Sequence, residues 1–321
     1  MAYKTNTTFM LIEKIINLKK DINIESTLFS GQSFLWDNYD YCRGYFFTVI
    51  NGYVLIIKQL MSDSIEIYYD SESGYAYDIT VFINQYLSLD IDSSMVFHDE
   101  FNCHYSDIWM LLREYLTLRV IRQDPYETMI SFMCAQGVGM HLIRKQITML
   151  RNTYGEKMPI TFFAKEIMLH KFPTPESLAA ADPLKLSICT NNNKERAKNI
   201  VLVARAVVEG RIDLVALRDP KIPLEVLRTT LCQNRGIGFK IADCIALFGL
   251  GRFDAFPIDT HVKQYMGRWF KCSTALRNLT PATYLLLDAE ARTFLNPKLA
   301  GYGGHMLFHC WRKEIKKLHS F

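Results

Sequence analysis

The sequence lacks long hydrophobic runs and paired cysteines. No uninterrupted apolar run approaches the ~18 residues that a membrane-spanning helix needs. The apolar part of the N-terminal stretch contains Glu13 and Lys14, which is unlike a secretory signal. The eight cysteines are scattered and form no Cys-x-x-Cys motif of the kind that binds zinc, holds an iron-sulfur cluster or acts as a redox dithiol. We therefore expect a cytoplasmic protein whose thiols are reduced and mostly buried.

Acidic residues dominate the first part of the chain and basic residues the rest. Residues 1–100 contain 6 Lys and Arg against 14 Asp and Glu, and the whole chain has 37 against 33, so the remainder has 31 against 19. This basic remainder favours a polyanionic partner, with nucleic acid as the first candidate. A surface that is merely soluble explains the charge equally well.

The hydrophobic pattern changes near residue 105. With 321 residues and 49% hydrophobic content, the chain is long enough for two or three domains. Residues 45–59, "YFFTVINGYVLIIKQ", are two apolar runs joined by Asn51-Gly52, a pattern typical of an antiparallel hairpin. Beyond residue 105, apolar residues recur at three- and four-residue spacing. We expect an α+β protein with an N-terminal antiparallel β-sheet domain, residues 1–104, packed on a mostly helical body, residues 105–321.

Two glycines, Gly236 and Gly238, separate two short predicted helices at about residues 224–250. They allow a tight turn whose backbone N–H groups point outward at the start of the second helix. Unpaired amides and the helix dipole both favour an anion there. In the basic part of the chain, this hairpin is a candidate phosphate-binding element.

A lysine, Lys240, follows the turn at the edge of an apolar helix face. Cys244 lies one turn later on the same face. Partial desolvation and the positive end of the helix dipole disfavour the ammonium and raise the fraction of nucleophilic amine. An exposed lysine whose aliphatic stem follows the edge of the core is the alternative.

An aspartate, Asp259, lies nineteen residues after Lys240 and directly before a helical pattern. It is a predicted N-cap. A carboxylate held rigidly at a helix start can also stabilise a developing cation, and both roles are compatible.

The stretch "GIGFKIADCIALFGL…FPIDTHV" resembles the helix-hairpin-helix DNA glycosylases and, within them, the 8-oxoguanine DNA glycosylases of bacteria or archaea. Four further segments resemble the family in the same order, so that the likeness spans nearly the whole chain: "SGQSFLW" (30–36), "RVIRQDPYETMISFMC" (119–134), "FPTPESLAA" (172–180) and "LAGYGGHMLF" (299–308). The resemblance implies that a damaged base is flipped out of the duplex. Lys240 would attack the sugar C1′, forming a Schiff base that can β-eliminate, and Asp259 would stabilise the cationic sugar.

The resemblance also implies roles for other residues. The backbone carbonyl of Gly31 would accept the N7 hydrogen of 8-oxoguanine, and Cys244 and Phe308 would sandwich the base. His261 would lie near the phosphate beside the lesion, and Arg196 would reach the opposite base. The expected DNA-binding residues are Arg196, Gly236, Gly238, His261 and Gln136. A C-terminal helix is expected at about residues 299–317.

Several positions depart from the family pattern. Residues 135–139, Ala-Gln-Gly-Val-Gly, stand where the family often has asparagines that read the opposite cytosine, with Gly137 at a usual asparagine. This departure predicts a relaxed opposite-base preference. Gly304 replaces the glutamine that reads the Watson–Crick edge, although His305 is adjacent. Glu195 replaces an aromatic residue, and Arg235 replaces the hairpin's usual proline.

No metal or organic cofactor is implied, although the family's hairpin can hold a monovalent cation through backbone carbonyls. The expected partner is duplex DNA containing a damaged base, bound by a monomer that associates with the nucleoid. Three alternatives stay open. A glycosylase for another modified base includes the endonuclease III type, which often has a four-cysteine cluster absent here. Alkyl-purine glycosylases share the hairpin and aspartate but not normally the lysine. A non-catalytic hairpin DNA-binding protein would leave Lys240 without a role.

Overall fold

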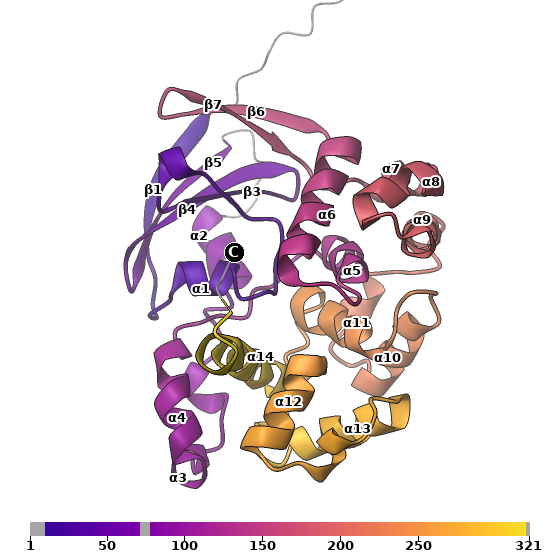
Figure 1. Ribbon diagram of the computed structural model, residues 1–321. Coiled ribbons are helices and arrows are strands. Elements are labelled where there is room, and N and C mark those ends of the chain that lie inside the picture. The colour runs from indigo at the N-terminus through magenta and orange to yellow at the C-terminus, as the bar shows by residue number, and fades with distance from the viewer. Residues whose placement is uncertain (1–9, 71–77, 319–321) are drawn as a thin grey trace, which may run out of the picture.

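The computed structural model describes residues 10–70 and 78–318 (Figure 1). The strands are β1 Leu11–Asn17, β2 Asp37–Asn38, β3 Tyr45–Ile50, β4 Tyr53–Met61, β5 Ser64–Asp70, β6 Lys157–Phe162 and β7 Lys165–His170. The α-helices are α1 Ile24–Leu28, α2 Ile79–Tyr86, α3 Phe101–His104, α4 Ser106–Leu112, α5 Pro125–Cys134, α6 Met140–Tyr154, α7 Pro175–Ala179, α8 Pro183–Leu186, α9 Lys194–Val208, α10 Leu224–Cys232, α11 Phe239–Cys244, α12 Thr260–Trp269, α13 Pro281–Ala291 and α14 Ala300–Cys310. Two π-helical turns, Ile245–Gly249 and Trp311–Ile315, continue α11 and α14.

The N-terminal strands form one antiparallel sheet in the order β1-β5-β4-β3-β2. The turn between β3 and β4 consists of Asn51 and Gly52, whose φ angles are 51° and 83°. Two successive positive φ angles match the right-handed twist of a two-residue hairpin. The predicted hairpin, and with it the α+β class, is confirmed.

Both faces of this sheet are covered. One face packs against α1 and α2 through a cluster that includes Ile24, Leu28 and Ile83. The other face is covered by the β6–β7 hairpin, which crosses it at the top of Figure 1 and inserts Phe162 and Ile167. Burial on both sides explains why every residue of β3 is buried and why its apolar residues do not alternate with exposed polar ones.

Within the mostly helical body, the β6–β7 hairpin is an element that the sequence did not predict. Residues 157–170 alternate buried and exposed side chains and pair as two antiparallel strands. Their inward side chains fill the outer face of the N-terminal sheet, so this segment of the later chain packs with the earlier domain. Conversely, three residues from the earlier part of the chain pack in the core of the helical body: Val96, Phe97 and Phe101.

The helical body is arranged around α5, which is buried along nearly its whole length. Its Phe132 stacks on Phe248 of the π-helical turn after α11, with ring centroids 5.4 Å apart. Helix α14 lies between the N-terminal domain and α12 (Figure 1) and is also buried nearly all round. The two domains therefore meet along α14 and α5, and the site described below lies at this junction.

A buried ion pair ties the hairpin helices α10 and α11 to each other and to α13. Arg228 donates two hydrogen bonds to Asp243, of 2.9 and 3.0 Å, and a third of 3.4 Å to Asp288. The side chain of Arg228 is 5% exposed and that of Asp243 is fully buried. Because an unpaired charge is very unfavourable at such depth, these residues fix how the two helices lie.

Candidate active site

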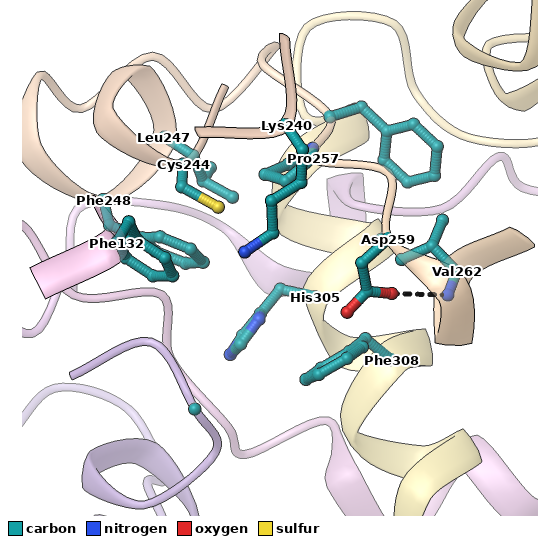
Figure 2. Close-up of a pocket in the computed structure, with 14 residues that line it drawn as sticks. Phe132, Lys240, Cys244, Leu247, Phe248, Pro257, Asp259, Val262, His305 and Phe308 are labelled. Atoms are coloured by element: carbon teal, nitrogen blue, oxygen red, sulfur yellow. Dashed lines mark hydrogen bonds between the residues drawn. The ribbon is translucent and has the colours of Figure 1, made fainter. Parts of the chain in front are cut away.

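A pocket opens at the junction of the two domains, between two walls (Figure 2). The α11–α12 wall consists of Lys240, Cys244 and Asp259. The α14 wall consists of Gly31, Gly304, His305 and Phe308. Phe132, Phe248 and Phe256 contribute aromatic surface between the walls, and the pocket contains about 410 Å³ of space, part of it open to solvent. Five chain segments thus meet at one site.

Lys240 is the second residue of α11, two residues after Gly238, the N-cap residue. Its side chain is half-buried, and its ammonium lies 4.9 Å from the centre of the Phe132 ring. Cys244 is 2% exposed, and burial raises the pKa of its thiol to about 12 against the opposing effect of the Lys240 charge. The lysine therefore faces an aromatic ring and a neutral thiol.

Asp259 caps α12, as predicted from the sequence. One of its carboxylate oxygens accepts a 2.9 Å hydrogen bond from the backbone N–H of Val262. Figure 2 shows Lys240 and Asp259 projecting into the same pocket from adjacent segments. The cap fixes the carboxylate, which leaves its other oxygen available to a cation.

Tyr284 of α13 links the two halves of the α11–α12 wall. Its hydroxyl donates a 2.6 Å hydrogen bond to Asp243 of α11 and accepts a 3.0 Å hydrogen bond from the N–H of Ile258. Ile258 directly precedes Asp259, and Asp243 lies three residues after Lys240. One buried hydroxyl therefore fixes the distance between the helix of the lysine and the segment of the aspartate.

Gly31 forms part of the opposite wall. Its φ of +94° disfavours other residues, and a Cβ there would lie 2.2 Å from Cε of Met140 and 3.7 Å from the ring of Phe308. Met140, from the start of α6, therefore lies against the glycine. The three predicted base-binding residues, Gly31, Cys244 and Phe308, line one pocket with Lys240 and Asp259.

Gly304 has no room for a side chain. A Cβ there would lie 2.2 and 2.5 Å from two atoms of the Phe256 ring, which is 1% exposed and fixed in the core. The neighbouring His305 lines the pocket and is held by Ser30, with 2.8 Å between Nε2 and Oγ. A polar ring thus lies beside the position where the family pattern has an amide.

The hairpin glycines differ in what they do. Gly236 has a φ of +91°, and a Cβ there would lie 3.1 Å from Asn199 of α9. Gly238 has an ordinary extended backbone, and a Cβ there would meet open space. The fold therefore requires a glycine at 236, whereas at 238 the missing side chain leaves the start of α11 open to a large ligand such as a phosphate backbone.

Gln136 and Arg196 lie beside the hairpin and outside the base pocket. The Gln136 side chain donates a 2.6 Å hydrogen bond to the carbonyl of Gly236. Arg196 is 7% exposed and donates to the carbonyl of Gln136 and, over 3.3 Å, to Gln146. Arg196 is therefore buried against the Gln136 backbone and is not a solvated charge on the surface of α9.

His261 lies at the outer mouth of the pocket, where its ring meets that of Phe308 edge-on at 5.9 Å. Burial, together with Arg312 and Lys316, lowers the pKa of His261 against the opposing effect of Asp259.

Four residues of this site were not predicted from the sequence: Phe132, Phe248, Phe256 and Met140. Each is an apolar residue within a helical or buried pattern, and no local signal separates it from ordinary core.

The part of the chain that the structure describes contains no group of three His, Cys, Asp or Glu side chains placed to hold a metal ion. Within the same residues, no helix is long and apolar enough to cross a membrane.

The hairpin carbonyls that could face a monovalent cation are those of Asn234 and Gly236. Both already accept a hydrogen bond, from the Ile237 N–H and from Gln136 respectively.

Two family models match consecutive parts of the chain. The 8-oxoguanine DNA glycosylase N-terminal domain matches residues 14–129, and the HhH-GPD superfamily base excision DNA repair protein matches residues 130–283. The N-glycosylase/DNA lyase OGG1 of Arabidopsis thaliana is 30% identical over 202 residues, which are 62% of this chain and 53% of that protein. The N-glycosylase/DNA lyase of Saccharomyces cerevisiae is 24% identical over 282 residues, 81% of this chain and 72% of that protein. The chain thus spans about half the length of the Arabidopsis relative.

Solved structures share the fold. The 8-oxoguanine glycosylase/lyase of Clostridium acetobutylicum, in complex with duplex DNA containing cytosine opposite 8-oxoG, superposes with a TM-score of 0.75 over 97% of this chain and 99% of that one, at 22% identity. Together the two family models extend without a gap from the N-terminal sheet through the hairpin to α13. Residues 130–283 belong to the HhH-GPD superfamily of base excision DNA repair proteins, and residues 14–129 to the N-terminal domain family of the 8-oxoguanine DNA glycosylases.

Proposed function

We propose that this protein is a bifunctional DNA glycosylase and AP lyase that excises 8-oxoguanine from duplex DNA. The observation that carries the proposal is the α11–α12 wall, where a half-buried lysine and a capping aspartate project into one pocket of aromatic residues. An amine and a carboxylate fixed on adjacent helix starts are the groups that imine chemistry at a sugar carbon requires. The names of the relatives support the same activity.

The reaction uses the chain's own groups. The Lys240 amine forms a bond to C1′ of the damaged nucleotide while the bond from C1′ to the base breaks, and the base leaves with the electron pair and takes up a proton. Opening of the sugar ring then gives a Schiff base. Loss of a proton from C2′ expels the 3′ phosphate and nicks the strand. Asp259 stabilises the positive charge that develops on the sugar.

The pocket walls suit a flat base. Cys244 offers a neutral apolar surface and Phe308 an aromatic one. A flipped base held between apolar side chains leaves its polar edges for hydrogen bonds to the protein. Gly31 lines the same pocket with a positive φ that disfavours any other residue, and its backbone carbonyl is the proposed acceptor for one edge of the base.

Duplex DNA with a damaged base is the proposed partner, bound by a monomer in the compartment that holds the DNA. The open start of α11 at Gly238 and the basic charge beyond residue 100 support contact with phosphates. The imine chemistry needs no organic cofactor. A monovalent cation at the hairpin would use carbonyls such as those of Asn234 and Gly236, each of which keeps a second lone pair.

The test is single-turnover excision with borohydride trapping, on duplexes carrying 8-oxoguanine opposite each of the four bases. We expect a covalent adduct that is lost in Lys240→Gln, with excision reduced by roughly 10³-fold or more. Lys185→Gln, an exposed lysine of α8 outside the pocket, is the matched control and should keep full activity. Similar yields opposite several bases would agree with Gly137 standing where asparagine is usual. Retained cleavage by Lys240→Gln would exclude the mechanism.

A further inference from the structure

One polar group of the pocket has no part in the proposed chemistry. Among the described residues that line the pocket, the charged or strongly hydrogen-bonding side chains are Lys240, Asp259 and His305. The first two belong to the reactive wall. His305 lies on the opposite α14 wall (Figure 2), beside a position that the Phe256 ring closes to any side chain.

The hydrogen bonds of Ser30 bear on which ring nitrogen of His305 carries the proton. The Ser30 hydroxyl donates its one proton to the carbonyl of Thr27, over 3.2 Å. With that proton on the Thr27 carbonyl, the hydroxyl accepts from His305 Nε2, 2.8 Å away, and Nε2 carries the ring proton. In a neutral ring, Nδ1 is then an acceptor with a free lone pair, and the described residues provide no hydrogen bond to it.

The surroundings keep this ring neutral and in place. His305 is 6% exposed, lies nearly parallel to Phe308 with centroids 5.8 Å apart, and meets Phe248 edge-on at 5.2 Å. Burial, with smaller effects from His309 and Arg312, lowers the pKa of His305 to about 3. The ring therefore presents an acceptor and not a cation.

We propose that His305 determines which base edge the pocket accepts, by taking a hydrogen bond at Nδ1 from a purine whose Watson–Crick edge carries donors. The inference rests on the proposed function and adds to it. A guanine-type edge offers the N1–H and the 2-amino group to this acceptor. An adenine-type edge places the N1 lone pair against it, which leaves two acceptors facing each other in a buried site.

The test compares three bases opposite a constant partner base. 8-Oxoguanine carries both donors, 8-oxohypoxanthine keeps N1–H without the 2-amino group, and 8-oxoadenine has an acceptor at N1. The wild type should excise 8-oxoguanine at least about 10-fold faster than 8-oxoadenine under single turnover. In His305→Phe this ratio should fall toward one, because the ring shape remains and the acceptor is removed. The rate on 8-oxohypoxanthine shows which donor is read.

Two variants and one substrate separate recognition from folding. His305→Asn keeps an amide acceptor near the position of Nδ1 and should retain part of the preference. His309→Phe replaces a second buried histidine of the same helix, outside the pocket, and should leave the ratio unchanged. Cleavage of a preformed abasic site, which needs no base recognition, should persist in all three variants.

The outcomes are distinct. An unchanged ratio in His305→Phe, with 8-oxoguanine excision intact, overturns the assignment. Equal loss of base excision and abasic-site cleavage in that variant also overturns it, since His305 would then only hold α14 to Ser30. If the wild type cleaves abasic sites but excises no 8-oxoguanine, the proposed function fails, and this inference fails with it.

Discussion

The two walls of the pocket are built by different kinds of interaction. The α11–α12 wall places Lys240 and Asp259 at two helix starts whose caps are local, at Gly238 and Val262, while Tyr284 and Arg228 hold these segments together. The α14 wall is set by contacts between distant parts of the chain. Ser30 bonds His305 across 275 positions, and Phe256 lies in the space beside Gly304.

This difference separates chemistry from recognition. Local rules of capping and helix periodicity place Lys240 and Asp259 at the two helix starts. Recognition of the base depends on how side-chain rings such as those of Phe256 and His305 fill the α14 wall. A change of volume at one position of this wall can be offset by a change at another. In this chain the α14 wall departs from the family pattern at Gly304, with His305 beside it. The α11–α12 wall has the lysine and the aspartate of the pattern.

The largest expected effect concerns the support of the α11–α12 wall. Arg228→Met should lower the free energy of unfolding by about 3–5 kcal/mol, because the fully buried Asp243 carboxylate would lose its ion pair, whereas Asp288 keeps Arg292. Urea unfolding measures it. Arg235→Met breaks an ion pair with Glu195 that is 68% exposed on both sides and should change stability by less than about 1 kcal/mol. Equal effects would mean that buried charge does not hold this wall.

A second prediction separates capping from chemistry at Asp259. Asp259→Asn should keep the cap on α12 and its stability, since asparagine caps a helix about as well. Excision should fall by roughly 10²–10³-fold, because the charge opposite the developing cation is lost. Asp182→Asn, at the N-cap of α8, is the matched control and should change neither quantity. Loss of stability with retained activity would leave Asp259 only a structural cap.

On the α14 wall, Gly304→Ala should destabilise the protein by about 1–3 kcal/mol, because its methyl group would meet the buried Phe256 ring. Thermal or urea unfolding measures the loss. Gly137→Ala is a glycine control with no atom near the added Cβ, although its φ of +66° adds some strain. If alanine at 304 were tolerated better than alanine at 137, position 304 would not be closed.

The smallest expected effect is a pH dependence from α14. Burial lowers the pKa of His309 to about 3, with smaller contributions from Lys313 and Arg312, so the folded protein binds this proton less readily than the unfolded chain. Its contribution to stability is complete above the unfolded pKa of about 6.5 and falls as the pH drops toward 3. Relative to the wild type, His309→Phe should lose about 1–2 kcal/mol less between pH 7 and pH 5. Parallel pH profiles of the two proteins would contradict this.

Much of the fold and of the reactive wall could be predicted from the sequence. Asn51-Gly52 marks its hairpin because few other pairs adopt two positive φ angles, and Asp259 marks its helix start because its side chain caps locally. These features depend on residues adjacent in the chain. The family resemblance then brought Gly31 and Phe308 to the same site, and the structure places them there.

What could not be predicted depends on contacts between distant segments. The β6–β7 hairpin alternates in burial only because the N-terminal sheet lies beneath it. From the sequence, Arg196 is expected to be an exposed charge on a helix, whereas in the structure it donates a hydrogen bond to the backbone carbonyl of Gln136. The proposed acceptor on His305 depends on its contact with Ser30, 275 positions away in the chain, which no local pattern encodes.

Peptide mapping of the borohydride-reduced adduct by mass spectrometry decides which amine of the protein attacks the sugar. The wild-type protein is reacted with a duplex containing one 8-oxoguanine, reduced, digested and sequenced. We expect the sugar remnant to be attached to Lys240. Attachment to another lysine or to the terminal amine, with Lys240 unmodified, would contradict it.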